Sequence, residues 1–150
     1  MKALYTEIDI DAPPEDVWDV LLDFGRYPEW NPFILEVLGT AEPGAKLRAT
    51  LSPPGGRAIT VKPTVTEVVA PRTLEWLGRL GFPGLFDGRH RFELHPSPNG
   101  TRLVQREVFT GMVVPVFARS LEQRTAKGFV AMNAALKRRV ERIITAEKRR

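Results

Sequence analysis

The first thirty residues change from an alternating pattern to a helical one. Residues 3–10 place apolar side chains at every second position, which is typical of a strand with one buried face. Residues 12–16 then look like a helix start, because proline is tolerated in a first turn and acidic residues favour the positive end of the helix dipole. Apolar residues over 17–22 continue that helix until a glycine and a proline end it. We expect a second short helix or turn over residues 27–31.

The middle of the chain consists of short strand-like runs between turn signals. The turns are rich in proline, glycine and asparagine, and their spacing is typical of consecutive antiparallel hairpins. Together with the first strand, the pattern predicts seven strands. The six later strands are expected at 34–40, 46–52, 57–69, 73–79, 86–95 and 101–110.

The last segment is an amphipathic helix. Apolar residues recur at three- and four-residue steps from about 116 to 146, with charged residues between them. Such a helix would be ~45 Å long at 1.5 Å per residue, so its basic end is expected to project or fray. Gly128 lies in its middle and marks either a kink or the close approach of another element.

These elements predict one α+β domain over residues 1–150. The strands need one buried face, and the C-terminal helix offers a wide apolar stripe to cover it. A curved, seven-stranded antiparallel sheet wrapped around this helix satisfies both requirements. The two short helices between the first and second strands would close one end.

Composition narrows the class of protein. Hydrophobic residues make up 43% and charged residues 27% of the chain, as in globular proteins. There is no cysteine, which excludes disulfides and thiol chemistry. No apolar run is long enough to span a membrane, and no secretory leader is recognisable. We therefore expect a cytoplasmic protein without stable membrane insertion.

The positive charge is concentrated at the C-terminal end. The chain carries a net charge of +4, of which residues 137–150 supply +5, so that the first 136 residues sum to −1. A basic tail can attract nucleic acid or anionic lipid. A solvated helix end whose cations complement the helix dipole explains it more simply. No nucleic-acid partner is expected.

The hairpin formed by 86–95 and 101–110 predicts which polar residues point inward. The turn at Asn99-Gly100 limits its register, and matching the apolar faces places Phe92 opposite Gln105 and His90 opposite Glu107. A slip of one residue would bury arginines instead. The sequence therefore predicts a His90–Glu107 pair pointing into the interior, with Gln105 beside it.

This pair has three possible roles. It can satisfy itself as a buried structural pair, orient a polar group of a ligand, or transfer a proton with His90 as the base. His95 falls on the other face of its strand and should be solvated. Because the two histidines cannot share a metal ion, no metal site and no cofactor are expected.

Aromatic residues come from many elements that must converge. Most should be ordinary core, but a sheet curled on one helix is hard to fill completely at one end, and leftover space would suit a small apolar ligand. The apolar loop 80–86 either covers an entrance or packs as a turn. The candidate ligand-binding residues are Trp30, Phe33, Trp76, His90, Phe92, Gln105, Glu107, Phe109, Phe117, Phe129, Met132 and Leu136.

The chain resembles a known superfamily over about residues 2–140. The opening stretch 8–13, the pair Val17-Trp18 and the stretch 27–33 are similar to the opening signature of the START/Bet v 1-like (SRPBCC) superfamily. Residues 84–94 and 107–111 are similar to its bacterial polyketide cyclase/dehydrase branch.

The resemblance implies a helix-grip fold around a hydrophobic cavity. Members bind lipids, sterols, polyketides, plant hormones or coenzyme Q-like molecules, some are enzymes, and others activate a chaperone ATPase. The branch assigns no role to His90 or Glu107, so an activity cannot be inherited from fold alone.

Three functions remain open at this point. The protein is a binder of a small hydrophobic molecule, a polyketide cyclase/aromatase-like enzyme with His90 as base and Glu107 orienting it, or an interaction module whose basic end contacts a partner. The sequence is compatible with a monomer or a dimer.

Overall fold

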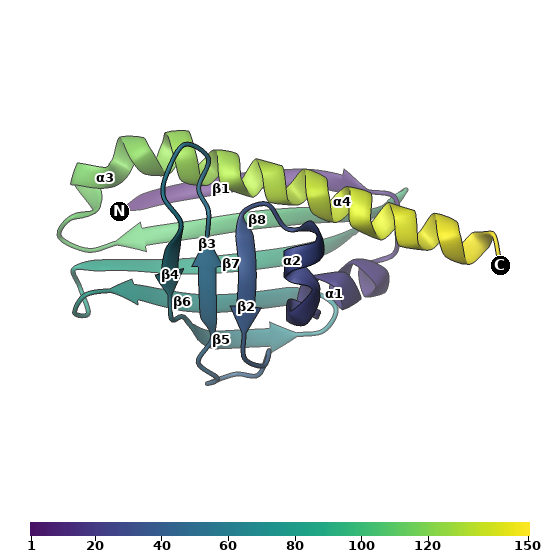
Figure 1. Cartoon of the computed structure of the whole chain (residues 1–150), viewed down its shortest axis with the longest axis horizontal. Coiled ribbons are helices and arrows are strands. Elements are labelled where there is room, and N and C mark those ends of the chain that lie inside the picture. Colours follow the sequence, from purple (N-terminus) through teal and green to yellow (C-terminus); the bar gives the residue numbers. More distant parts are fainter.

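The computed structural model describes all residues 1–150 and contains two antiparallel sheets. The main sheet has five strands in the order β1-β8-β7-β6-β5. Its strands are β1 (Lys2–Ile10), β5 (Thr64–Val69), β6 (Thr73–Leu80), β7 (Phe86–Ser97) and β8 (Gly100–Thr110). The small sheet, ordered β2-β3-β4, is formed by β2 (Ile34–Leu38), β3 (Arg48–Leu51) and β4 (Ile59–Val61). Figure 1 shows the small sheet crossing one face of the main sheet.

The predicted α+β class and the curved antiparallel arrangement are confirmed, but the strand count is different. The expected strand 57–69 is two strands, because the chain leaves the small sheet at Pro63 and enters the main one. Proline has no N–H to donate to a ladder, so it interrupts a central strand. The sheets stay joined at this corner, where Lys46 pairs with Thr64 and the Val65 N–H donates to the Ala45 carbonyl.

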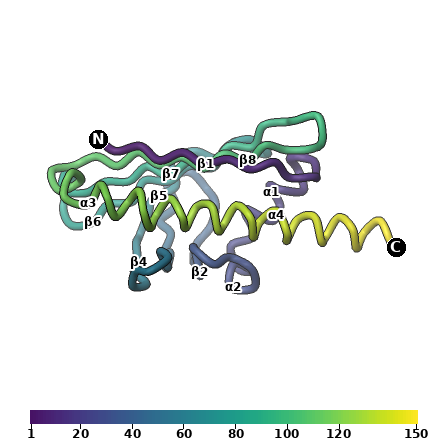
Figure 2. The backbone as a smooth tube through the Cα atoms, turned by 90° about the horizontal axis from the view of Figure 1, so that it is seen from above, coloured from purple at the N-terminus to yellow at the C-terminus, as the bar shows by residue number.

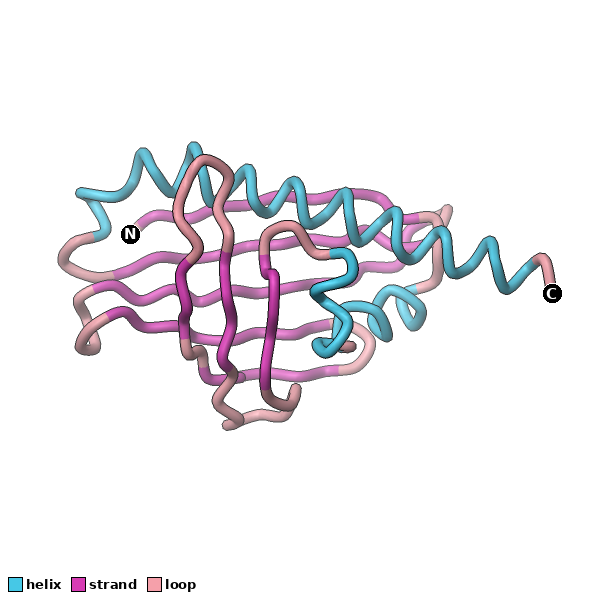
Figure 3. The backbone as a smooth tube through the Cα atoms, in the orientation of Figure 1, coloured by secondary structure: helices cyan, strands magenta, loops and turns pink.

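The two short helices between the first strands are confirmed. They are α1 (Pro14–Leu22) and α2 (Tyr27–Trp30), with a 3-10 turn over Phe24–Arg26 between them. Pro14 opens α1 and acidic residues follow in its first turn, as expected. The buried Tyr27 hydroxyl donates to the Leu21 carbonyl and ties the helices together. Figure 3 shows this helical pair beside the small sheet, on the side towards which the C-terminal helix extends.

The C-terminal helical segment runs along the open side of the main sheet. It consists of α3 (Val114–Ser120), a π-helical turn over Leu121–Thr125, and α4 (Ala126–Lys148). Figure 2 shows α4, α2 and the small sheet on the same side of the main sheet. The basic end of α4 stays helical and extends beyond the sheets.

Gly128 is explained by close approach. A Cβ at this position would overlap the ring of Phe33, which packs directly on the helix backbone. Phe33 in turn contacts Phe129 edge-on, with ring centroids 5.6 Å apart. The glycine thus lets the segment before β2 lie against α4.

The outer face of the main sheet carries a charged network. Arg91 donates to Glu75 and Glu93 at 3.1 and 2.7 Å. Burial alone would raise the pKa of Glu75, but hydrogen bonds from Arg89, Thr66 and Arg91 outweigh it and hold the pKa below its ordinary 4.5. Burial would raise the pKa of Glu93 as well, but its hydrogen bonds to arginine and histidine side chains together lower it. This network stabilises a face that no other element covers.

No helix of the structure combines the length and the apolar character that crossing a bilayer requires.

Candidate ligand-binding cavity

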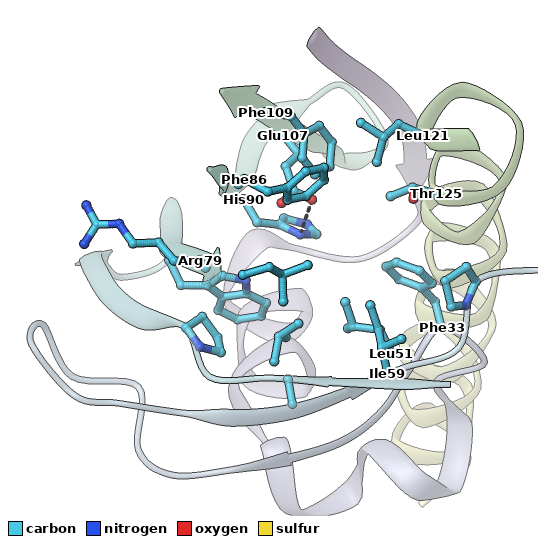
Figure 4. A pocket seen from close by; sticks show the side chains of 18 residues that line it. Phe33, Leu51, Ile59, Arg79, Phe86, His90, Glu107, Phe109, Leu121 and Thr125 are labelled. Carbon is cyan, nitrogen blue, oxygen red and sulfur yellow. Dashed lines mark ion pairs between the residues drawn. The ribbon is translucent and has the colours of Figure 1, made fainter. Parts of the chain in front are cut away.

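An apolar cavity lies between the two sheets and the start of the C-terminal helical segment. Its volume is ≈ 150 Å³. The main sheet contributes Trp76 and Phe109, and the small sheet contributes Leu51 and Val61. Leu121 closes it from the π-helical turn (Figure 4). The cavity is therefore a junction of three layers and not a gap within one of them.

Two glycines on neighbouring strands create much of this space. Gly78 of β6 pairs with Gly88 of β7, and Gly88 pairs with Phe109 of β8. They share the inner face with Trp76 and His90, because each lies two residues away from one of these. Two adjacent positions of the inner face therefore have no side chain, and the sheet is hollow there.

The inward-facing pair predicted from the hairpin is present. His90 pairs with Glu107 and Phe92 with Gln105 in the ladder, so the predicted register is confirmed. The His90 Nδ1 atom lies 3.4 Å from Glu107 Oε1, and both side chains line the cavity. Figure 4 shows the carboxylate directed towards the imidazole from the neighbouring strand.

The other nitrogen of His90 is held by a chain of buried amides. Nε2 lies 2.9 Å from Gln105 Oε1. The Gln105 amide nitrogen donates to Asn133 Oδ1 at 2.6 Å, and the Asn133 amide nitrogen donates to Thr6 Oγ1 at 3.0 Å. A polar chain therefore runs from α4 and β1 through the core to the imidazole.

Aromatic rings fix the plane of the imidazole. Phe92 stacks on His90, with centroids 4.4 Å apart and an interplanar angle of 19°. Phe129 lies at 4.8 Å and Trp76 at 5.4 Å. The hydrogen bond at Nε2 and the packing of aromatic rings on both faces hold His90 in one orientation.

Glycine also makes room for the carboxylate. A Cβ on Gly88 would overlap Glu107 Oε2 and crowd Phe109. The side chain of Glu107 is 14% exposed and that of His90 is 5% exposed. Glu107 is therefore the more accessible member of the pair from the cavity.

Apart from His90 and Glu107, no charged group is directed into the cavity. Arg79 borders the cavity, but Figure 4 shows its guanidinium pointing away, and its Nε lies 3.7 Å from Asp87 Oδ1. No three His, Cys, Asp or Glu side chains are grouped so that they would hold a metal ion. His95 is on the opposite face of the sheet, as predicted, where it contacts Glu93 at 3.0 Å.

Eleven of the twelve predicted site residues fall into three groups. Five line the cavity: Phe33, Trp76, His90, Glu107 and Phe109. Phe117 lines a second hollow that continues from it towards the surface. Five others are buried and form the structure behind the walls, namely Phe92, Gln105, Phe129, Met132 and Leu136.

Trp30 is not part of this cavity. It lines a separate hollow between α1, α2 and α4, beside Arg139 and Val140. Its ring contacts Tyr27 edge-on, with centroids 5.1 Å apart. Its position in a short helix between strands could not show which side of α4 it would meet.

Sequence reasoning missed several wall residues. The small-sheet residues were missed because alternation identifies a strand but not the sheet to which it belongs. Glycines within strands often mark close approach, so Gly78 and Gly88 were a usable signal. The missed residues include Ala49, Leu51, Ile59, Val61, Gly78, Gly88, Leu121 and Thr125.

A larger, more open hollow connects the cavity to the surface. It has a volume of ≈ 470 Å³ and shares Ile59, Leu80, Phe86 and Leu121 with the inner cavity. Part of the apolar loop 80–86 borders it, so this loop lies at the entrance. The entrance also touches the π-helical turn, a feature frequently found at functional sites.

Comparison with known families identifies the chain. Residues 1–143 match the family model described as polyketide cyclase / dehydrase and lipid transport. The chain belongs to this family. The resemblance to the cyclase branch of the START/Bet v 1-like superfamily is thereby confirmed. No functionally curated protein matches the chain by sequence.

Solved structures agree with the family assignment at the level of the fold. The Zhui aromatase/cyclase from Streptomyces sp. R1128 is 20% identical, with a TM-score of 0.77 and 95% of each chain covered. The protein TTHA0849 from Thermus thermophilus is 15% identical, with a TM-score of 0.76 over 94% of this chain and 98% of that one. The di-domain aromatase/cyclase StfQ of the steffimycin pathway is 13% identical, with a TM-score of 0.78. This family member spans 52% of StfQ, with 95% of its own length covered.

Proposed function

We propose that the protein binds a small hydrophobic molecule of lipid, polyketide or aromatic type in the cavity between the sheets and the C-terminal helices. The observation that carries this proposal is an apolar cavity with one histidine–carboxylate pair, His90–Glu107, on its wall. Ligand sites are typically apolar hollows with a few polar groups that fix orientation. The family's description, which includes lipid transport, supports the same class of ligand.

The size of the cavity limits what it holds. An engineered apolar cavity of about 150 Å³ in another protein takes up one benzene molecule. The inner cavity, ≈ 150 Å³, therefore suits one ring, and the outer hollow accommodates the rest of a larger ligand. A ligand with a ring inside and a chain or further rings outside fits this shape.

Native mass spectrometry of freshly purified protein tests the proposal, with organic extraction of the bound material. Ala49→Leu adds volume to a buried wall position, whereas Ala3→Leu makes the same change on an exposed position. We expect a stoichiometric ligand on wild type and Ala3→Leu, and at least a tenfold lower occupancy on Ala49→Leu. Equal occupancy in all three would place the ligand elsewhere. If the protein purifies empty, the same comparison is made by titration with 4-fluorotoluene, and no binding to wild type would contradict the proposal.

A second candidate is a cyclase-type enzyme acting on a hydrophobic carbonyl compound. The His90–Glu107 pair on an apolar wall favours it, because such ring closures need mainly a shaped cavity and proton transfer. Two structural neighbours are aromatase/cyclases.

The enzyme hypothesis can be tested with a model diketone such as heptane-2,6-dione. Its ring closure is measured by NMR as the loss of the diketone signals. Ring closure faster than in buffer, with a pH–rate profile that changes in His90→Gln, would support it. An identical profile for both proteins would exclude a role of the histidine in proton transfer.

A further inference from the structure

We propose that Glu107, and not His90, is the polar group that a ligand meets, and that the cavity selects a ring carrying a hydroxyl group. The inference rests on the proposed binding function and specifies its ligand chemistry. It follows from which atoms of the pair already have partners within the protein.

Neither nitrogen of His90 is free to contact a ligand. Nε2 is held by Gln105 Oε1 at 2.9 Å, and Nδ1 faces Glu107 Oε1 at 3.4 Å. Gln105 Oε1 can only accept, so Nε2 carries the hydrogen of that contact, and Nδ1 faces the Glu107 carboxylate. Phe92 and Phe129 cover the ring. His90 is therefore a positioning residue.

Glu107 has one oxygen left over. Oε1 faces the imidazole, whereas Oε2 lies over Gly88, where even a methyl group would overlap it. Oε2 has no hydrogen-bond partner of its own in the protein, although its side chain is only 14% exposed. A carboxylate oxygen that lacks a donor and lies on the wall of an apolar cavity is a strong acceptor for a ligand.

The ligand group that meets Glu107 Oε2 must be a hydrogen-bond donor. If the pair holds one additional proton between Nδ1 and Oε1, Oε2 remains an acceptor, as it does in the free carboxylate. The walls next to it are aromatic, since Phe109 adjoins Gly88 and Trp76 contacts His90. The inner volume of ≈ 150 Å³ admits one ring. A phenol-like or enol-like ring with its O–H directed at Oε2 satisfies all three conditions.

The test uses two probes of nearly the same shape. 4-Fluorophenol donates a hydrogen bond and 4-fluorotoluene does not, and ¹⁹F NMR titration gives both dissociation constants. We expect wild type to bind the phenol at least about tenfold more tightly, since a site built around a buried polar group rejects an analogue that leaves it unpaired. Equal affinities would overturn this inference and leave the binding function intact. Binding of neither probe would overturn both.

Variants then show which side chain causes the preference for 4-fluorophenol over 4-fluorotoluene. In Glu107→Gln, a neutral amide replaces the carboxylate, and the preference should fall to threefold or less while the affinity for 4-fluorotoluene changes little. Glu36→Gln makes the same change on an exposed strand position and should keep the wild-type preference. A full preference in Glu107→Gln would assign the contact to another group.

A second variant covers the case in which Glu107→Gln fails to fold. Gly88→Ala keeps the carboxylate of Glu107, but the added methyl group forces it to move. This variant should also reduce the preference for the phenol. His90→Gln removes the imidazole and should weaken the preference without abolishing it, because the acceptor oxygen remains. If the preference were lost in His90→Gln and kept in Gly88→Ala, His90 would be the contact and the inference would be wrong.

Discussion

The imidazole of His90 is held in one tautomer by the amides behind it. Gln105 donates its amide hydrogens to Asn133 Oδ1 at 2.6 Å and lies 3.4 Å from the Phe129 carbonyl, which can only accept. This orientation directs the Gln105 oxygen at His90 Nε2, which must then carry the hydrogen. The tautomer is thus set by residues that never touch the cavity.

We predict that His90 carries a hydrogen on Nε2 in the free protein. Long-range ¹H–¹⁵N spectra distinguish the two ring nitrogens, and Nε2 should show the shift of a protonated nitrogen. His95 is the only other histidine, is exposed on the opposite face, and serves as an internal reference. An unprotonated Nε2 on His90 would mean that the Gln105 amide is turned around.

At the same scale, sequence alone predicted the inward pair but not its surroundings. Parity along two strands with a fixed turn was enough to place His90 opposite Glu107 with Gln105 adjacent. Asn133 was not predicted as a partner of Gln105, because helical periodicity identifies a buried face but not the side chain that it meets. Gly88 was not recognised as the space that Glu107 occupies, since that requires the distance across the ladder.

Among the elements, β7 contributes residues both to the cavity and to the outer charged network. Its inner face presents Gly88 and His90 to the cavity, while its outer face places Arg91 and Glu93 in the charged network with Glu75.

The outer network predicts a loss of stability in acid. Because the folded-state pKa of Glu75 and of Glu93 is below the ordinary 4.5, their contribution is complete above that value and is lost as the pH falls below it. Urea unfolding between pH 6 and pH 3 should show this decline. Glu75→Gln should lower stability by about 1–3 kcal/mol at pH 6 and flatten the decline, since it removes the acceptor of a largely buried network. An unchanged pH dependence in this variant would contradict the assignment.

The elements also show where alternation along the chain stops being informative. The strands 86–95 and 101–110 were predicted well because a tight turn joins them. The range 57–69 was wrong as one strand, since the pattern of apolar residues continues through the point where Pro63 transfers the chain between sheets. The π-helical turn at Leu121–Thr125 leaves no periodic signal of its own.

In the whole molecule, the cavity and the basic tail lie at opposite ends of the C-terminal helical segment. The cavity meets Leu121 and Thr125, whereas the basic end of α4 extends beyond the sheets (Figures 1 and 2). Some basic residues of this region form ion pairs: Lys137 pairs with Glu141 at 2.6 Å and Arg139 with Glu29 at 2.8 Å. The remaining basic residues form an exposed helix end.

This arrangement predicts that the end of the tail does not contribute to ligand binding. Removing residues 146–150 should change the affinity for 4-fluorotoluene by less than about twofold, because none of these residues lines the cavity or its entrance. ¹⁹F titration of the truncated protein measures this. A large loss of affinity with the fold intact would show that the tail takes part in ligand binding.

Methyl NMR shows whether this cavity holds the ligand. In ¹³C-methyl-labelled protein titrated with 4-fluorotoluene, we expect saturable shifts at Leu51, Val61 and Leu121, which line the cavity. We expect none at Ile143 and Ile144, which line the hollow beside Trp30. Shifts confined to Ile143 and Ile144, or no shift up to the solubility limit of the probe, would contradict it.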